Sequence, residues 1–345
     1  MSSQVGVSPK MDSMRALILE HAHPVEETPL READLPIPTP GPGEVRVRVR
    51  ACGLCHTDLH TVEGDLPPHK SPVVPGHQIV GVIDAVGAGV TAHREGDRIG
   101  VPWLHSTDGT CEFCHSGLEN LCLNARFTGY DVDGGYAEYA VAPAEFCYPI
   151  PAVFSDENAA PLLCAGIIGY RSYRLTAVRP GENLGLYGFG ASAHLVIQLA
   201  RHEQCNIFVF TRNEAHRALA RELGAVWTGR AEDTPPEPLH AAIIFAPAGS
   251  LVPQALRVLR KAGRLALAGI TMSQIPALDY SLLYHEKVIR SVANSTRQDA
   301  RQFLALAGEV PLKTEVQLFD LGQANQALQA LKKSEIRGAG VLRLS

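Results

Sequence analysis

Two thiols and an imidazole in this chain form a set of side chains suited to binding one zinc ion. Cys55 and Cys164 supply the thiols, and His77, which lies between them in the sequence, supplies the imidazole. A catalytic zinc is commonly held by three protein ligands of these types, and its fourth position stays open to water or substrate. The three residues are far apart in the sequence, so spacing alone does not establish that they converge.

The remaining cysteines also favour metal binding over disulfides. The chain has eight cysteines, and its first 13 residues are polar without the apolar segment of a secretory signal. Cys111, Cys114 and Cys122 are close together in the sequence, which is typical of a metal site. Cys147 and Cys205 are interpreted as small core residues. We expect a frayed N-terminal extension over residues 1–13, a fold that begins after it, and a cytoplasmic location.

A second kind of chemistry is indicated by two glycines in the C-terminal half. Gly188 and Gly190 follow a predicted strand and precede a predicted helix that begins at Ala191, with Ala193 in the third position of the G-x-G-x-x-G/A pattern. Glycines at such a turn let the backbone approach a pyrophosphate, which then lies at the helix N-terminus. The segment therefore predicts a dinucleotide site; the alternative is a tight turn that binds no nucleotide.

The residues that follow the next predicted strand bear on the choice of cofactor. NAD-specific folds place a carboxylate there, which binds the adenosine ribose, but this chain has Thr211, Arg212 and Asn213. A hydroxyl and a guanidinium could hold a 2′-phosphate, with Arg217 one turn further on as a possible helper. We therefore predict NADP; if Arg212 is only a solvated loop residue, the chain would accept NAD as well.

Composition sets broad limits on the function. The chain has 345 residues, enough for about two domains, with 46% hydrophobic residues, 19% charged residues and a formal net charge of -5. No basic excess suggests nucleic acid or an anionic membrane as a partner. No apolar run is long enough for a transmembrane helix. These values are ordinary for a soluble globular protein.

The elements that must position these residues fall into two kinds. Up to about residue 148 the chain is rich in short β-like segments, such as the alternating 45–50 and the apolar 79–83, separated by turn residues. This pattern predicts a compact, β-rich, partly open barrel. From residue 161 strands and helices alternate, which predicts a doubly wound parallel sheet and an α/β fold class.

The alternating part is expected to hold five strands and three helices. After residue 295 we expect two helices and a last strand, 340–344, that returns to the first domain. The domains are therefore predicted as 1–165 with 295–345, and 166–294. Expected helices are 161–177, 191–202 and 214–223, and expected strands are 184–187, 207–210, 242–245, 264–268 and 288–292.

From its fourteenth residue onward, the chain resembles the zinc-dependent medium-chain alcohol dehydrogenases, in particular the cinnamyl-alcohol-dehydrogenase-like and bacterial aldehyde-reductase branches. The resemblance implies a GroES-like catalytic domain beside a Rossmann domain, with a catalytic zinc on Cys55, His77 and Cys164. The matching segments, in the family's order, are 52–60, 75–81, 96–98, 134–139, 161–166 and 188–190.

The same resemblance implies roles for the neighbours of Cys55. Thr57 corresponds to a hydroxyl that passes the substrate proton through the cofactor ribose to His60, which can titrate near neutral pH. His56 corresponds to a contact of the cofactor pyrophosphate. Asp58 is placed like the partner that orients His77. Cys52 is not a ligand in this pattern and is interpreted as a packing residue.

Two departures from the family pattern concern the metals. The family usually has Glu after the ligand histidine, whereas this chain has Gln78, which removes one negative charge behind the zinc but no ligand. Typical members also hold a structural zinc on four cysteines in a surface lobe. Here three are kept, and Asp108 replaces the first. A carboxylate can bind zinc and preserves the ligand charge, so we expect an occupied site; the alternatives are an empty lobe or His115 as the substitute ligand. The expected ligands of this second zinc are Asp108, Cys111, Cys114 and Cys122.

The substrate pocket is predicted from two positions. Trp103 matches a residue that lines the family's substrate cleft, unless it is barrel core, and Leu66 lies where some relatives have a second bulky aromatic. A wider pocket favours medium-chain, allylic or aromatic primary alcohols and aldehydes. We expect an NADP(H)-dependent zinc alcohol dehydrogenase or aldehyde reductase that forms a dimer or tetramer and binds neither nucleic acid nor membranes. The alternatives are an NAD(H)-dependent enzyme for short-chain alcohols, a zinc-free quinone or enoyl reductase, and a protein without enzymatic activity.

Overall fold

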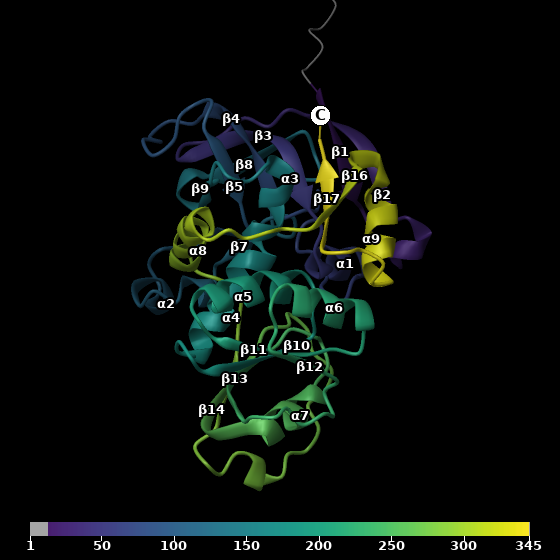
Figure 1. Cartoon of the computed structure of the whole chain (residues 1–345). Coiled ribbons are helices and arrows are strands. Elements are labelled where there is room, and N and C mark those ends of the chain that lie inside the picture. The colour runs from purple at the N-terminus through teal and green to yellow at the C-terminus, as the bar shows by residue number, and fades with distance from the viewer. Residues whose placement is uncertain (1–12, 345) are drawn as a thin grey trace, which may run out of the picture.

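The computed structural model describes residues 13–344. Residues 1–12 of the expected extension therefore lie outside the described residues, and Ser13 is the first residue of strand β1 (Ser13–Leu19). Figure 1 shows two bodies of secondary structure, with the N-terminal strands and the C-terminal strand together in the upper one. None of the helices in the described part of the chain has the length and apolar character that a membrane crossing requires.

The upper body is built on a seven-stranded sheet with the strand order β16-β17-β3-β4-β5-β9, in which β8 also pairs with β3. The expected strands 45–50 and 79–83 are confirmed as the cores of β3 and β4. In β3 Val45, Val47 and Val49 are buried and the arginines between them are more exposed, because successive side chains of a strand point to opposite faces. The strands are β3 (Glu44–Gly53), β4 (Gln78–Val86), β5 (Arg98–Val101), β8 (Tyr139–Pro143), β9 (Tyr148–Pro149), β16 (Val316–Asp320) and β17 (Ala339–Arg343).

The lower body is a six-stranded sheet, and every pair of neighbouring strands in it is parallel. The strand order is β12-β11-β10-β13-β14-β15. From β10 the chain first adds strands on one side of the sheet and then, from β13 on, on the other. The switch point between β10 and β13 is where doubly wound sheets bind nucleotides. The predicted α/β class and the parallel sheet are confirmed. The strands are β10 (Asn183–Tyr187), β11 (Asn206–Phe210), β12 (Trp227–Gly229), β13 (Leu239–Ile244), β14 (Leu259–Leu267) and β15 (Val288–Ser291).

Helices in the lower body follow the expected pattern with one correction. The helix expected over 191–202 is α5 (Ala191–His202), and that expected over 214–223 is α6 (Glu214–Glu222). The single helix expected over 161–177 is wrong. A 3-10 turn, η4 (Ala160–Leu163), precedes α4 (Ala165–Thr176), because Cys164 between them has φ -127° and ψ -71°, outside the helical region. Strand β12 and helix α7 (Leu251–Val258) were not expected from the sequence.

The remaining elements belong to the upper body and its edges. The final strand, β17, pairs antiparallel with β3, which confirms the expected return of the chain to the first sheet. These elements are β2 (Leu30–Pro36), β6 (Leu104–Ser106), β7 (Arg126–Phe127), α1 (His56–Glu63), α2 (Glu112–His115), α3 (Asp156–Ala159), α8 (Arg297–Glu309) and α9 (Ala324–Lys332).

The chain passes between the two sheets twice, and the connecting helices α4 and α8 pack against each other. At their contact a Cβ atom placed on Gly166 would lie 2.3 Å from the ring of Phe303, so the helices approach as closely as glycine permits. Tyr170 also packs on Phe303, with ring centroids 5.9 Å apart. The two segments that connect the bodies therefore pack together as a pair of helices, α4 and α8.

This close contact predicts that Gly166→Ala destabilises the protein by about 1–3 kcal/mol, because the new methyl group overpacks the core. The midpoint of urea unfolding at fixed protein concentration measures the effect. Gly308→Ala in α8 is the matched control: its Cβ would meet its nearest neighbour at an ordinary 3.4 Å. It should be neutral or stabilise by up to about 1 kcal/mol. Equal midpoints for the two variants would contradict the close packing of α4 and α8.

Candidate active site

The structure brings Cys55, His77 and Cys164 together. One ligand atom from each lies within 4.8 Å of the other two, and the two sulfur atoms are 3.7 Å apart. Tetrahedral zinc with bonds to sulfur of about 2.3 Å would separate two thiolates by roughly 3.8 Å. The spacing of the donors therefore fits zinc.

Local structure explains this convergence. Strands β3 and β4 are antiparallel neighbours with Gly53 opposite Gln78, so the residues just outside their paired ends, Cys55 and His77, meet at one edge of the sheet. Cys55 is also the N-cap of α1. Cys164 lies between η4 and α4, where the helix is interrupted. The non-helical backbone of Cys164 was not predicted from the sequence.

His77 supplies a direct test of whether a metal fits. Its side chain is completely buried, and its Nδ1 lies 2.8 Å from a carboxylate oxygen of Asp58. Its Nε2 is buried and has no hydrogen-bond partner among the described residues. An imidazole held by a carboxylate on one nitrogen and free on the other has the arrangement of a metal ligand. Asp58 therefore occupies the position expected for it.

The electrostatics of the group also favour a cation. Burial disfavours the charged imidazolium, but Asp58 and the Cys55 sulfur outweigh this and raise the pKa of His77 to about 10. The pKa of Cys55 is well below its usual value, mainly because the Cys164 thiol donates a hydrogen bond to it, and that of Cys164 is correspondingly raised. The pocket thus already stabilises positive charge beside a thiolate. A divalent metal would replace the proton on Nε2 of His77 and the proton of the Cys164 thiol.

The two residues of the expected proton path lie on α1, three positions apart. Thr57 is buried, and its hydroxyl is 3.7 Å from the Cys55 sulfur. His60 lies further out: its Nδ1 is 3.0 Å from Asp65, and its Nε2 is 3.5 Å from the hydroxyl of Thr271. Thr271 follows β14 in the lower body, so His60 bridges the two bodies. Neither Asp65 nor Thr271 was anticipated, since no sequence pattern marks them.

Three further residues lie beside this site. His56 is the exposed first residue of α1. The Gln78 side chain is buried against Gly53, where an added Cβ would lie 2.8 Å from its amide oxygen. Cys52 is fully buried, burial raises the pKa of its thiol, and it stands outside the group of metal-binding atoms.

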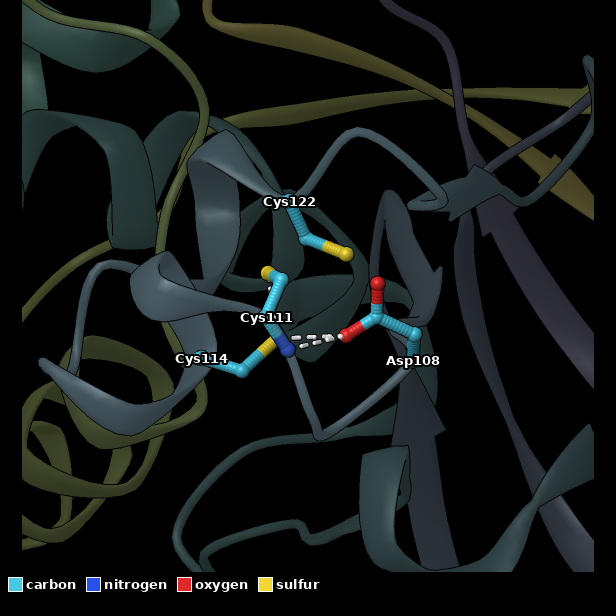
Figure 2. Close-up of side chains that lie close together, drawn as sticks. All are labelled: Asp108, Cys111, Cys114 and Cys122. Carbon is cyan, nitrogen blue, oxygen red and sulfur yellow. Dashed lines mark hydrogen bonds between the residues drawn. The ribbon is translucent and has the colours of Figure 1, made fainter.

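A second group of potential metal ligands lies in the lobe after β6. Figure 2 shows the side chains of Asp108, Cys111, Cys114 and Cys122 gathered around one point, and their ligand atoms lie within 4.8 Å of one another. His115, the alternative ligand, is exposed and does not belong to this group. The geometry therefore fits one metal held by a carboxylate and three thiolates.

The Asp108 carboxylate is held in place by several donors. The backbone N–H groups of Thr110 and Cys111 each lie 2.9 Å from one of its oxygens, and the Cys114 thiol lies 3.4 Å from the same oxygen. The Asn124 amide donates to the other oxygen at 2.9 Å. The Thr110 N–H, the Asn124 amide and the Cys111 N–H hold the pKa of Asp108 well below its usual range. The group is therefore a carboxylate, the form that binds metal.

The glycine turn lies at the switch point of the parallel sheet. Gly188 has φ +86°, and an added Cβ would meet Ala246 at 3.1 Å, whereas a Cβ on Gly190 would point into open space. Gly190 is the N-cap of α5 and supplies no side-chain cap, so the first N–H groups of the helix, from Ala191 on, are free to bind an anion. The arrangement fits a pyrophosphate.

Arg212 on the loop after β11 and Arg217 on α6 have different surroundings. Arg217 donates to the backbone oxygens of Thr211 at 2.7 Å and Arg212 at 3.3 Å, and it also pairs with Glu214. Its guanidinium therefore shapes the loop. The Arg212 side chain is exposed on the same loop, beside the partly buried Thr211.

Trp103 stands beside the first group of ligands. Its ring packs edge-on against His77, with centroids 4.9 Å apart, and stacks on Phe127 at 5.0 Å. Tyr130 completes an aromatic wall at 5.8 Å from Trp103. Leu66 is half-buried in the loop after α1. Phe127 and Tyr130 were not anticipated, because strand β7 and the turn after it have no recognisable sequence pattern.

Comparison with known proteins agrees with this geometry. Residues 41–152 match the model of the alcohol dehydrogenase GroES-like domain, and residues 193–309 match that of the zinc-binding dehydrogenases. The probable alcohol dehydrogenase AdhA of Mycobacterium tuberculosis is 47% identical over 336 residues, which cover 96% of this chain and 97% of that protein.

Solved structures give the same result. A cinnamyl alcohol dehydrogenase of Sorghum bicolor is 27% identical, with a TM-score of 0.86, over 96% of this chain and 98% of that one. An acetophenone reductase of Geotrichum candidum in complex with NAD is 25% identical, with a TM-score of 0.87, over 98% of this chain and 99% of that one. The chain therefore belongs to the zinc-binding medium-chain alcohol dehydrogenase family, and it is an oxidoreductase with sites for zinc and for a nicotinamide cofactor.

Proposed function

We propose that this chain is an NADP(H)-dependent zinc alcohol dehydrogenase that acts mainly as an aldehyde reductase on medium-chain, allylic or aromatic substrates. The observation that carries the proposal is the group of Cys55, Cys164 and the buried, unpartnered Nε2 of His77. The aromatic wall of Trp103 beside His77 supports an aromatic or allylic substrate. We assign residues 1–165 and 295–345 to the catalytic domain and 166–294 to the cofactor domain.

Each residue of the proposed catalytic group has a separate task. Bound zinc supplies a Lewis acid that stabilises negative charge on the substrate oxygen. Cys55 and Cys164 would hold the metal as thiolates together with Nε2 of His77, and Asp58 would keep the proton of neutral His77 on Nδ1. Buried Thr57 would accept the alcohol proton, and His60 would exchange it with solvent; a bound cofactor would supply a ribose hydroxyl between them.

A homo-oligomer is part of the proposal. β15 ends the six-stranded sheet, so within residues 13–344 one side of this strand has no neighbour in that sheet. Val288 on this strand is 47% exposed, and Tyr280 and Tyr284 in the segment before it are 71% and 65% exposed. An edge strand flanked by exposed apolar side chains is suited to pairing with a second copy of the chain. Light scattering of the purified protein measures the oligomeric state.

Thr57→Val should lower kcat for alcohol oxidation by about 100-fold or more, because the proton path loses its first hydroxyl. Thr57→Ser is the matched control and should retain most of the activity. His60→Ala should slow the reaction less, and added imidazole should restore the rate. Steady-state kinetics across neutral pH measures these effects. An unchanged kcat for Thr57→Val would contradict the proposed path.

The cofactor assignment is tested by comparing NADPH and NADH over a panel of aldehydes, with and without a zinc chelator. We expect lower KM values with NADPH and loss of activity with chelator. Arg212→Ala should raise the KM for NADPH by about 10–100-fold, since a charged hydrogen bond to the 2′-phosphate is lost, and leave that for NADH unchanged. Arg257→Ala, an exposed arginine on α7, is the control. A wild-type preference for NADH would refute the NADP assignment and favour the NAD-dependent alternative.

The second metal site is tested by metal analysis of purified variants. Wild-type protein should contain two zinc ions per chain, Asp108→Ala one, and Asp108→Cys two, because a thiolate restores the ligand. Glu112→Ala is the matched control, since Glu112 is an exposed acid of the same lobe outside the ligand group. One zinc ion in the wild-type protein would show that Asp108 does not complete the site.

A further inference from the structure

A buried carboxylate joins the two helices that connect the domains. Asp299, near the start of α8, is 1% exposed and accepts hydrogen bonds from Arg171 at 2.6 Å and Arg174 at 3.0 Å, both on α4. It also accepts bonds from the backbone N–H and the hydroxyl of Thr296 and thereby caps α8. Charge-assisted bonds of this kind are stronger than neutral ones, so α4 and α8 are fixed to each other.

The cysteine-rich lobe reaches this junction through Asn120, which is 6% exposed. The Asn120 amide nitrogen donates to the backbone oxygen of Ala293 at 2.6 Å, in the stretch between β15 and α8. Its amide oxygen accepts a bond from Arg171 on α4 at 3.5 Å. One side chain of the lobe therefore contacts both passages of the chain between the domains.

Glu119, the preceding residue, caps α8 from outside the helix. One carboxylate oxygen accepts the backbone N–H of Arg297 at 2.7 Å, and the other accepts the Arg297 side chain at 2.8 Å. Arg297 is the first residue of α8, so its N–H has no partner within the helix. A negative charge at this end is also favourable for the helix dipole. Glu119 is 6% exposed, so water does not weaken the contact.

The lobe metal would hold both residues in place. Glu119 and Asn120 belong to the 3-10 turn η2 (Glu119–Leu121), and the residue after this turn is Cys122, one of the grouped ligands. A metal bound by Cys122 and Asp108 would restrain the end of this turn.

We propose that Glu119 and Asn120 are positioning residues that set the angle between the cofactor domain and the catalytic domain, with the lobe metal as their anchor. The part that concerns the metal rests on the proposed function of Asp108. The expected consequence lies in cofactor binding and hydride transfer, because a displacement of about 1 Å between reacting groups can reduce a rate by roughly 100-fold.

Glu119→Gln and Asn120→Ala test the positioning role in the full-length protein loaded with zinc. We expect the dissociation constant of NADPH, measured by nicotinamide fluorescence, to rise by about tenfold in each variant, as for one lost buried hydrogen bond. Amide hydrogen exchange in residues 293–299 should also become faster. Glu119→Gln keeps the shape of the side chain, so it remains informative if Asn120→Ala folds poorly.

Glu145→Gln is the matched control. Glu145 also pairs with Arg297, but it belongs to the 3-10 turn η3 (Ala144–Phe146) of the barrel and not to the lobe. Its replacement should change cofactor affinity less than about twofold, as for an exposed ion pair. If Glu119→Gln and Asn120→Ala lower only the unfolding midpoint and leave cofactor affinity at the wild-type value, the residues are merely structural and the proposal is wrong.

The metal anchor is tested by combining Asp108→Ala with Asn120→Ala. If the metal acts through η2, the dissociation constant of NADPH for the double variant should equal that of whichever single variant binds NADPH less tightly. Independent, multiplying effects on the dissociation constant would overturn the anchor. If Asp108→Ala retains both zinc ions, the proposed role of Asp108 fails instead, and the outcome for Glu119→Gln still decides the positioning role.

Discussion

The geometry of the site depends on one carboxylate that makes two contacts. Asp58 accepts the backbone N–H of Cys55 at 2.9 Å with one oxygen and holds Nδ1 of His77 at 2.8 Å with the other. The first contact caps α1 and the second orients an imidazole that comes from before β4. A single side chain thus sets the helix start and the position of two ligands. Its burial at 2% exposure keeps water from competing for either contact.

Glycines around this carboxylate allow the segments to approach. Gly53 leaves space for the buried amide of Gln78, and Gly76, with φ +96°, would place a Cβ 2.4 Å from the ring of Tyr136. Side chains at these positions would push the ligand-bearing segments apart. The arrangement of the metal-binding atoms therefore depends on the absence of side chains at Gly53 and Gly76 as well as on the ligands themselves.

The sequence predicted the regular parts of this protein well and the irregular parts poorly. Alternation in residues 45–50 and the apolar stripe of residues 191–202 identified β3 and α5, because burial on one face determines both patterns. The backbone break at Cys164 was missed, since the residues around it are compatible with a continuous helix. The convergence of the three ligands was inferred from family resemblance rather than from spacing. Contacts between residues far apart in the sequence, such as Trp103 with Phe127, leave no local pattern.

The contact between His60 and Thr271 places the outer end of the proposed proton path where the two bodies meet. His60 belongs to α1 of the upper body, Thr271 follows β14 of the lower body, and their side chains meet at 3.5 Å. If the two bodies moved apart, His60 would lose this partner and keep its contact with Asp65. In the proposed mechanism, the proton therefore leaves the site at a contact to which both bodies contribute a side chain.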